Sequence, residues 1–325
     1  MIKRLGILLL LLVNCWPVKV FSWGFYAHQR INRLAVFTLP PEMIRFYKKH
    51  IVYITENAVN PDKRRYVVKA EGPRHFIDLD VYGDSVGQKL PRLWQDAVAK
   101  YGEDSLARHG VLPWHISLVK YQLTEAFKHH DVPAILRLSA DLGHYLADAC
   151  VPLHTTRNYN GQFTNQHGIH GFWESRLPEL LANGYDFFVG PAVYVAKPQQ
   201  KAWDIVFRSY TALDSVLLFE KEVAAQLPED KKYTFEERNN ITVKTYSRAY
   251  TTGYHQKLKG QVERQMRYAV WMLGSFWYTC WVDAGQPDLN NLQPLTPEQK
   301  KQLEDERQQL KQVVVPDRPH ETEED

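Results

Sequence analysis

The chain contains few cysteines, and its charges nearly cancel. Only 3 of its 325 residues are cysteine, and two of these, Cys150 and Cys280, lie beyond residue 22. They could form a disulfide or stay buried as free thiols, and the sequence leaves both open. The 40 basic residues and 37 acidic residues give a formal net charge of +3. This balance argues against an extended basic surface for duplex DNA, although a local basic groove is compatible with it.

Long hydrophobic runs are also missing. Leu5–Val13 is an apolar run too short to cross a bilayer as a mature helix. Residues 268–285 are apolar, but glycine, serine and threonine interrupt them, which suits a buried helix better than a membrane span. The sequence has no nucleophile elbow, glycine-rich phosphate loop or Cys/His dyad, so no organic cofactor and no covalent nucleophile are expected.

The first residues have the features of a secretory signal peptide. A short basic start precedes the apolar run, and Val20 and Ser22 suit the small-residue positions of a signal-peptidase site. Cleavage after Ser22 would make Trp23 the first residue, with a free α-amine. The sequence therefore predicts a signal peptide over 1–22 and a secreted or periplasmic protein. A lipoprotein processed at Cys15 is the alternative.

Helical periodicity dominates the rest of the chain, whereas alternating strand patterns are scarce. We therefore expect an all-α fold, with a single multi-helix domain over 23–290. Residues 291–325 are polar and strongly charged, and they predict a solvated helix that frays into a disordered tail. The segments with an apolar stripe are 27–39, 41–59, 112–130, 133–150, 201–227 and about 242–282, the last with a break.

Two polar side chains fall on an apolar face of the segment 133–150. His144 and Asp148 are four residues apart, so in a helix both project from one side. The flanking positions are apolar, so this side is buried or borders a buried face. Pro152 ends the helix, and His154 follows on the turn just beyond it. Two polar groups that point inward need a partner, and a cation is a suitable one.

A second pair with the same spacing follows within about thirty residues. His170 and Glu174 are four apart, and His167 is a further candidate three residues earlier. His75 and Asp78 stand in the stretch RHFIDLD. Several histidines and carboxylates without thiolates predict a metal site, and this donor set favours zinc over manganese or iron.

These motifs resemble the zinc-dependent phospholipase C and fungal-type single-strand nuclease superfamily. An N-terminal tryptophan, an HxxxD, a PLH and an HxxxE occur here in the family's order, from Trp23 to about Glu174. The resemblance implies a secreted all-α phosphodiesterase whose helices enclose a trinuclear zinc cleft. It also implies that signal cleavage creates a metal ligand, because the family's terminal tryptophan binds zinc through its own amine and carbonyl.

The resemblance assigns nine residues to the three zinc ions. One zinc would be held by Asp62, His75, His144 and Asp148, a second by His154, His170 and Glu174, and the third by the amine and carbonyl of Trp23, the His28 ring and Asp148 as a bridging carboxylate. The assignment of Asp62 depends on its distance before His75, and Asp78 or Asp80 is the alternative.

The chemistry that the resemblance implies is attack of a metal-activated water on phosphorus. Asp62 would orient the water or act as the base. Phe76 and Asp78 are candidates for contact with the substrate, although core packing would also suit Phe76. Arg64 and Arg65 could meet a phosphate or simply be solvated.

The substrate is open between a phospholipid head group and single-stranded nucleic acid. Glu174 and the short interval from His154 to His170 favour the phospholipase C branch, whereas the short step from Trp23 to His28 favours the nuclease branch. No lipid-binding β-domain follows the helices, so at most peripheral membrane contact is expected. A secreted module with structural zinc is a third hypothesis, but such sites are usually closed and rich in thiolates.

Overall fold

The computed structural model describes residues 24–83, 90–238 and 241–313, and helices make up most of them. The predicted all-α fold is confirmed: the described residues contain a single two-stranded sheet beside the helices. The signal peptide and Trp23 lie outside the described residues. No helix in the described part of the chain is long and apolar enough to cross a membrane.

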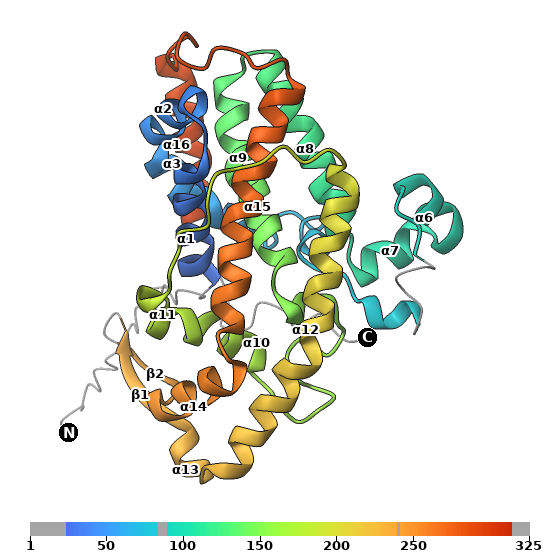
Figure 1. Cartoon of the computed structure of the whole chain (residues 1–325), viewed down its shortest axis with the longest axis vertical. Helices are drawn as coiled ribbons and strands as arrows, with labels where there is room; N and C mark the ends of the chain where they lie inside the picture. Colours follow the sequence, from blue (N-terminus) through green and yellow to red (C-terminus); the bar gives the residue numbers. More distant parts are fainter. Residues whose placement is uncertain (1–23, 84–89, 239–240, 314–325) are drawn as a thin grey trace, which may run out of the picture.

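Five helices form the bundle that carries the rest of the fold. Figure 1 shows α9 running through its middle, and α9 contacts the other four. The five are α1 (Gly24–Ala35), α8 (Leu112–Lys128), α9 (Val132–Ala149), α12 (Pro198–Gln226) and α15 (Gln261–Asp283). Because α9 is surrounded, almost all of its side chains from Ser139 to its end are buried.

Shorter elements join and cover these helices. Before α8 lie α2 (Pro41–Lys49), α3 (Ile51–Glu56), α4 (Asn60–Arg64), α6 (Trp94–Tyr101), α7 (Glu103–His109) and the turns η1 (Val36–Thr38), η2 (Asn57–Val59), η3 (Gly72–His75) and η4 (Leu79–Tyr82). After α9 lie η5 (Pro152–Thr155), α10 (Ile169–Gly171), η6 (Phe172–Arg176), α11 (Leu177–Leu181), η7 (Ala182–Gly184), α13 (Glu229–Lys232), α14 (Arg248–Leu258) and α16 (Pro297–Lys311).

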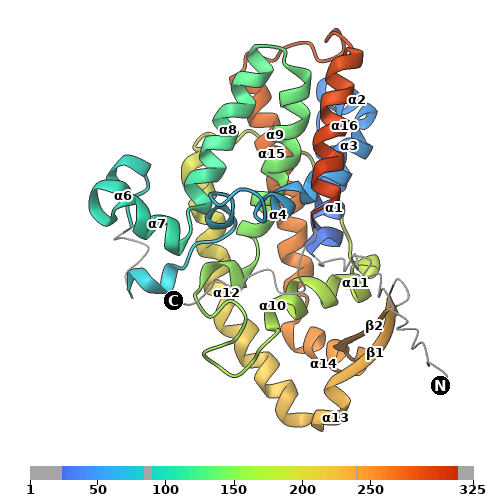
Figure 2. The ribbon, with the colours of Figure 1, turned by 180° about the vertical axis from the view of Figure 1, so that it is seen from behind.

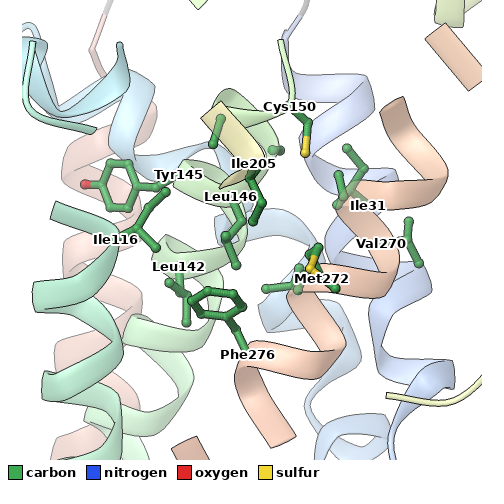
Figure 3. Close-up of a cluster of buried hydrophobic side chains, with 14 of the residues drawn as sticks. Ile31, Ile116, Leu142, Tyr145, Leu146, Cys150, Ile205, Val270, Met272 and Phe276 are labelled. Atoms are coloured by element: carbon green, nitrogen blue, oxygen red, sulfur yellow. The ribbon is translucent and has the colours of Figure 1, made fainter. Parts of the chain in front are cut away.

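The core lies where the bundle helices meet (Figure 3). Leu142 and Leu146 of α9 face Ile116 of α8 and Phe276 of α15, and all four are fully buried. Burial of apolar surface on this scale is the main favourable term in folding. It also fixes the rotation of α9 about its axis, so the opposite edge of this helix presents its polar residues in a constant direction.

One glycine permits the close approach of α1 and α9. A Cβ atom on Gly143 would lie 2.2 Å from the side-chain oxygen of Asn32, which is closer than atoms can pack. Asn32 is fully buried, and its amide donates a hydrogen bond to the carbonyl of His28, 3.1 Å away. The contact brings the rings of His28 and His144 into a stack with centroids 3.9 Å apart.

The sequence-based expectation is wrong at one segment in the second half of the chain. The last helical segment was predicted to begin at about residue 242, but β1 (Tyr233–Arg238) and β2 (Ile241–Tyr246) form an antiparallel hairpin there. The helix begins only at Arg248, after Ser247 caps it by accepting from the Tyr250 amide. Consecutive β-branched residues in β2 favour a strand over a helix.

The charged C-terminal segment is also more ordered than expected. Helix α16 begins with a complete capping box formed by Thr296 and Gln299. Arg307 pairs with Glu56 of α3, and Leu310 is buried. Figure 2 shows α16 on the same side of the molecule as α2 and α3, and α16 contacts α4. The structure therefore corrects the predicted solvated tail as far as Lys311.

The two cysteines are buried and do not pair. Cys150 follows α9 and Cys280 lies in α15, and both are free thiols. Burial raises the pKa of each thiol to about 12, so both behave as small apolar core residues.

Candidate metal centre

The fold gathers eight of the nine predicted ligand residues into three adjoining clusters that could hold metal ions. The first cluster contains Asp62, His75 and His144, the second contains His154, His170 and Glu174, and the third contains His28, His144 and Asp148. The ninth residue, Trp23, lies outside the described residues. The eight come from seven elements, α1, α4, η3, α9, η5, α10 and η6, so the centre is a product of the tertiary fold.

The first cluster joins two histidine rings with one carboxylate. The Nδ1 atom of His75 lies 3.0 Å from Nε2 of His144, and Oδ1 of Asp62 lies 3.8 Å and 3.6 Å from these two atoms. Asp148 adds its Oδ2 atom at 3.0 Å from His75 Nδ1 and 3.2 Å from His144 Nε2. The structure thus brings together all four residues that were predicted to share one ion.

The alternatives to Asp62 are placed elsewhere. Asp78 lies 3.5 Å from Nδ1 of His109. Asp80 accepts a hydrogen bond from the Thr156 hydroxyl at 2.8 Å. Neither carboxylate belongs to the three clusters, so Asp62 is the carboxylate of this part of the chain that faces the histidines.

The second cluster is equally compact. Nε2 of His154 lies 3.0 Å from Nε2 of His170, and Oε2 of Glu174 lies 3.2 Å and 3.1 Å from them. His167, the other candidate in this stretch, is not part of the cluster. The four-residue spacing of His170 and Glu174 works because α10 continues directly into the π-helical turn η6.

The third cluster shares residues with the first. Nε2 of His28 lies 3.3 Å from Oδ1 of Asp148, and His144 stacks on the His28 ring. Asp148 therefore turns one oxygen toward the first cluster and the other toward His28. This is the arrangement that a bridging carboxylate needs.

Local sequence explains why these side chains point inward. His144 and Asp148 lie one turn apart on the buried side of α9, with exposures of 0% and 1%. After α9 ends, Pro152 begins η5, and the carbonyl of His154 accepts a hydrogen bond from the Ile77 amide. That bond ties the His154 turn to the chain that follows His75, so the two histidines stay close.

Backbone carbonyls fix the orientation of two of the rings. Nδ1 of His144 donates to the carbonyl of Ala58 at 2.8 Å, and Nδ1 of His154 donates to the carbonyl of His75 at 2.7 Å. A carbonyl can only accept, so each Nδ1 carries a proton. The opposite Nε2 atoms then direct their lone pairs, once deprotonated, into the clusters. Metal-binding histidines are typically held in this way.

The charges of the centre suit a cation. Burial alone would lower the pKa of His144, but Asp148 and Asp62 raise it to about 9. His154 also rises to about 9, because Asp148 and Glu174 outweigh its burial. Burial would raise the pKa of Asp148, yet His144 and His154 hold it well below its usual range. Protons on these rings therefore occupy the place that a metal ion would take.

The centre opens at two of its carboxylates. The side chains of Asp62 and Glu174 are 20% and 15% exposed, whereas those of His144 and Asp148 are almost completely buried. An apolar pocket borders the second and third clusters, and its lining includes Ile31, Cys150, Trp173 and Met266 beside His28 and Glu174. A bound ion would thus meet protein ligands on one side and an accessible edge on the other.

The two substrate candidates lie next to the centre along the chain. Phe76 follows His75 and is half-buried, with its backbone packed against Gly110. Asp78 is 8% exposed, and its pKa rises to about 7 through burial and the nearby charge of Asp80. Neither position decides whether the side chain meets a substrate.

Sequence reasoning missed a buried polar network behind the first cluster. Arg64 was expected to meet a phosphate or to be solvated, but its guanidinium pairs with both carboxylate oxygens of Asp141, at 3.2 Å and 2.8 Å. It also lies 3.5 Å from Glu71. A signal for Glu71 existed, since it stands four residues before His75, the same spacing as in the other two pairs.

No protein-family model matches this chain, and no curated protein matches it in sequence. The functional conclusion therefore depends on the side chains of the centre itself.

Proposed function

We propose that this protein is a secreted zinc-dependent phosphodiester hydrolase of the phospholipase C and single-strand nuclease superfamily. The observation that carries the proposal is the set of three adjoining clusters built from five histidines and three carboxylates, joined through Asp148. Such a density of ligands exceeds what one structural ion needs.

The donor set supports zinc in particular. The clusters contain imidazole nitrogens and carboxylate oxygens and no thiolate, and both described cysteines are free and buried away from them. Calcium and magnesium prefer oxygen ligands alone, whereas imidazole with carboxylate is typical of catalytic zinc. The accessible edge at Asp62 and Glu174 argues against a closed structural site and against the hypothesis of a non-catalytic zinc module.

The residues of the centre would divide the work of hydrolysis. Bound zinc lowers the pKa of a water molecule and neutralises charge on phosphoryl oxygens. Asp62 has the exposed carboxylate of the first cluster, so it can orient the attacking water and accept its proton. The backbone carbonyls behind His144 and His154 keep both rings in place throughout. Phe76 and Asp78 are proposed to contact the substrate near His75.

A phospholipid head group is the substrate class that we favour. Glu174 and the short interval between His154 and His170 resemble the phospholipase branch. The pocket beside the centre has an apolar wall, which suits an uncharged neighbour of the phosphate better than a polyanionic strand. The nuclease alternative rests on the short step from Trp23 to His28, and it remains the second candidate.

A direct test compares two substrates with one zinc-loaded preparation. The expected result is a kcat/KM for a chromogenic phosphocholine ester that exceeds the value for denatured DNA, with about three zinc ions per correctly cleaved chain. Faster cleavage of DNA would move the protein to the nuclease branch. Zinc binding without hydrolysis of either substrate would contradict the enzyme and favour the structural module.

A further inference from the structure

A buried carboxylate lies behind the ring of His75, on the side away from the other ligands. Glu71 is 1% exposed, and its Oε1 atom lies 3.7 Å from Nε2 of His75. The other ring nitrogen, Nδ1, lies 3.0 Å from both His144 Nε2 and Asp148 Oδ2. The two nitrogens of one ring therefore face two different groups, the first cluster and Glu71.

Nε2 of His75 is buried and makes no hydrogen bond within the described part of the chain. Its nearest acceptor is the Glu71 carboxylate, and a small tilt of the ring would close the gap. His144 and His154 have backbone carbonyls in the corresponding place. His75 differs from them because the acceptor behind it carries a full negative charge.

The carboxylate of Glu71 is itself held firmly. The Tyr145 hydroxyl donates to Oε1, and Arg74 donates to Oε2 at 2.8 Å. Arg64 approaches the same oxygen and is anchored on its far side by Asp141. Burial alone would raise the pKa of Glu71, but the Arg64 charge and the Tyr145 hydrogen bond lower it. The carboxylate is thus ionised and cannot rotate away without breaking several contacts.

We propose that Glu71 is a positioning residue that accepts the Nε2 proton of His75 and so directs the Nδ1 lone pair into the first cluster. The inference rests on the metal centre proposed above. A charged acceptor behind a histidine fixes its tautomer and makes the ring a stronger donor to metal. Glu71 would therefore act on zinc through His75 without touching the ion.

The competing role for Glu71 is structural neutralisation of Arg64 and Arg74. The two roles differ in what they predict for the folded protein. A structural residue contributes to the unfolding free energy and leaves the zinc affinity of molecules that remain folded unchanged. A positioning residue changes that affinity and the tautomer of His75 as well.

The test is Glu71→Gln, with Glu220→Gln as a matched control. Glu220 is also 1% exposed and is bound by a lysine, Lys232, and a tyrosine hydroxyl, that of Tyr250, but it contacts no residue of the clusters. Zinc affinity is measured by competition with a chromogenic chelator on protein shown to be folded. We expect Glu71→Gln to weaken one zinc site about 10- to 100-fold, while Glu220→Gln lowers stability and keeps all affinities.

A second readout follows the ring directly. In zinc-loaded protein labelled with 15N-histidine, His75 should be protonated at Nε2, and its signal should change in Glu71→Gln. Equal zinc affinities in Glu71→Gln and wild type, or a His75 ring protonated at Nδ1, would overturn the inference. If Glu71→Gln does not fold, Tyr145→Phe removes one contact of the carboxylate and should weaken the same site to a smaller degree, while unchanged affinity there would count against the proposal.

Failure of the inference can be told apart from failure of the proposed function. Wild-type protein that binds zinc but hydrolyses nothing would overturn the function and leave the role of Glu71 intact. Wild-type protein that binds no zinc would overturn both.

Discussion

At the scale of single residues, Asp148 connects the parts of the centre. Its two oxygens lie within 3.3 Å of ring nitrogens of His28, His75 and His144. A buried carboxylate in this position balances the positive charge of protonated rings in the metal-free protein and would bridge ions in the loaded one. Its loss should therefore affect every cluster at once.

We expect Asp148→Ala to abolish hydrolysis and to lower stability by about 3 to 5 kcal/mol, because it leaves buried charged rings without a partner. Zinc content, turnover and denaturant unfolding measure the three effects. His129→Ala is the control, since the His129 side chain is 77% exposed and outside the clusters. Normal activity in purified Asp148→Ala protein would refute the assignment of the centre.

The terminal residue supplies a second prediction at this scale. An α-amine binds metal only when it is free and unprotonated, and an internal peptide nitrogen has no available lone pair. One extra residue before Trp23, such as a retained methionine, should lose one zinc ion and most activity while the fold survives. Trp23→Phe with correct cleavage should keep the ion. Three zinc ions and full activity in the extended protein would show that the terminus is not a ligand.

At the scale of elements, the local spacing of residues predicted much of the centre and long-range contacts decided the rest. Pairs four apart, such as His144 with Asp148, were predictable because a helix places them on one side. The partner of Arg64 was not, since Asp141 is 77 residues away and only the packing of α4 on α9 brings them together. Sequence periodicity contains no record of such pairings.

The hairpin shows the same limit in another form. Phe172, next to the second cluster, stacks on Tyr246 at the end of β2, with ring centroids 3.9 Å apart. Arg176 donates to the Tyr246 carbonyl and pairs with Glu236 of β1. The strands are short and lie between helices, so their alternating pattern was absorbed into a helical segment. Their packing supports the turn that carries Glu174.

The contact of α1 with α9 gives a prediction for an element. Gly143→Ala would place a methyl group against Asn32, and overpacking of this kind costs about 1 to 3 kcal/mol. The helices must separate, so His28 should also move away from His144 and zinc occupancy should fall. Gly253→Ala in α14 is the control, because a Cβ there lies in ordinary contact, 3.6 Å from Val223. Equal thermal stability and zinc content in both variants would refute the role of Gly143.

At the scale of the whole molecule, the centre lies where seven elements meet, so its charges stabilise or destabilise the entire fold. The all-α fold was predictable, because apolar stripes of helical period run through most of the chain. The docking of α16 was not, since its sequence is largely charged and one buried residue, Leu310, with the Arg307–Glu56 pair, joins it to the domain.

Coupling between the centre and the fold predicts opposite pH dependences for the metal-free and zinc-loaded protein. His144 and His154 have pKa values raised from 6.5 to about 9 in the folded chain. A raised pKa contributes stability that is complete below 6.5 and is lost as pH rises through 9. The carboxylates Asp148 and Glu174, with lowered pKa values, contribute above their ordinary values of 3.8 and 4.5 and lose this stability as pH falls.

The metal-free protein should therefore lose unfolding free energy between pH 6.5 and pH 9, as measured by urea titration with a chelator present. Zinc binding displaces the same protons, so zinc affinity should rise over this interval, and the stability gained from buffered zinc should rise with it. Asp148→Asn removes the charge that raises both histidines and should flatten the metal-free profile. A metal-free stability that stays constant or increases toward pH 9 would mean that these rings are neutral in the folded protein, and that no proton has to leave when a metal ion enters.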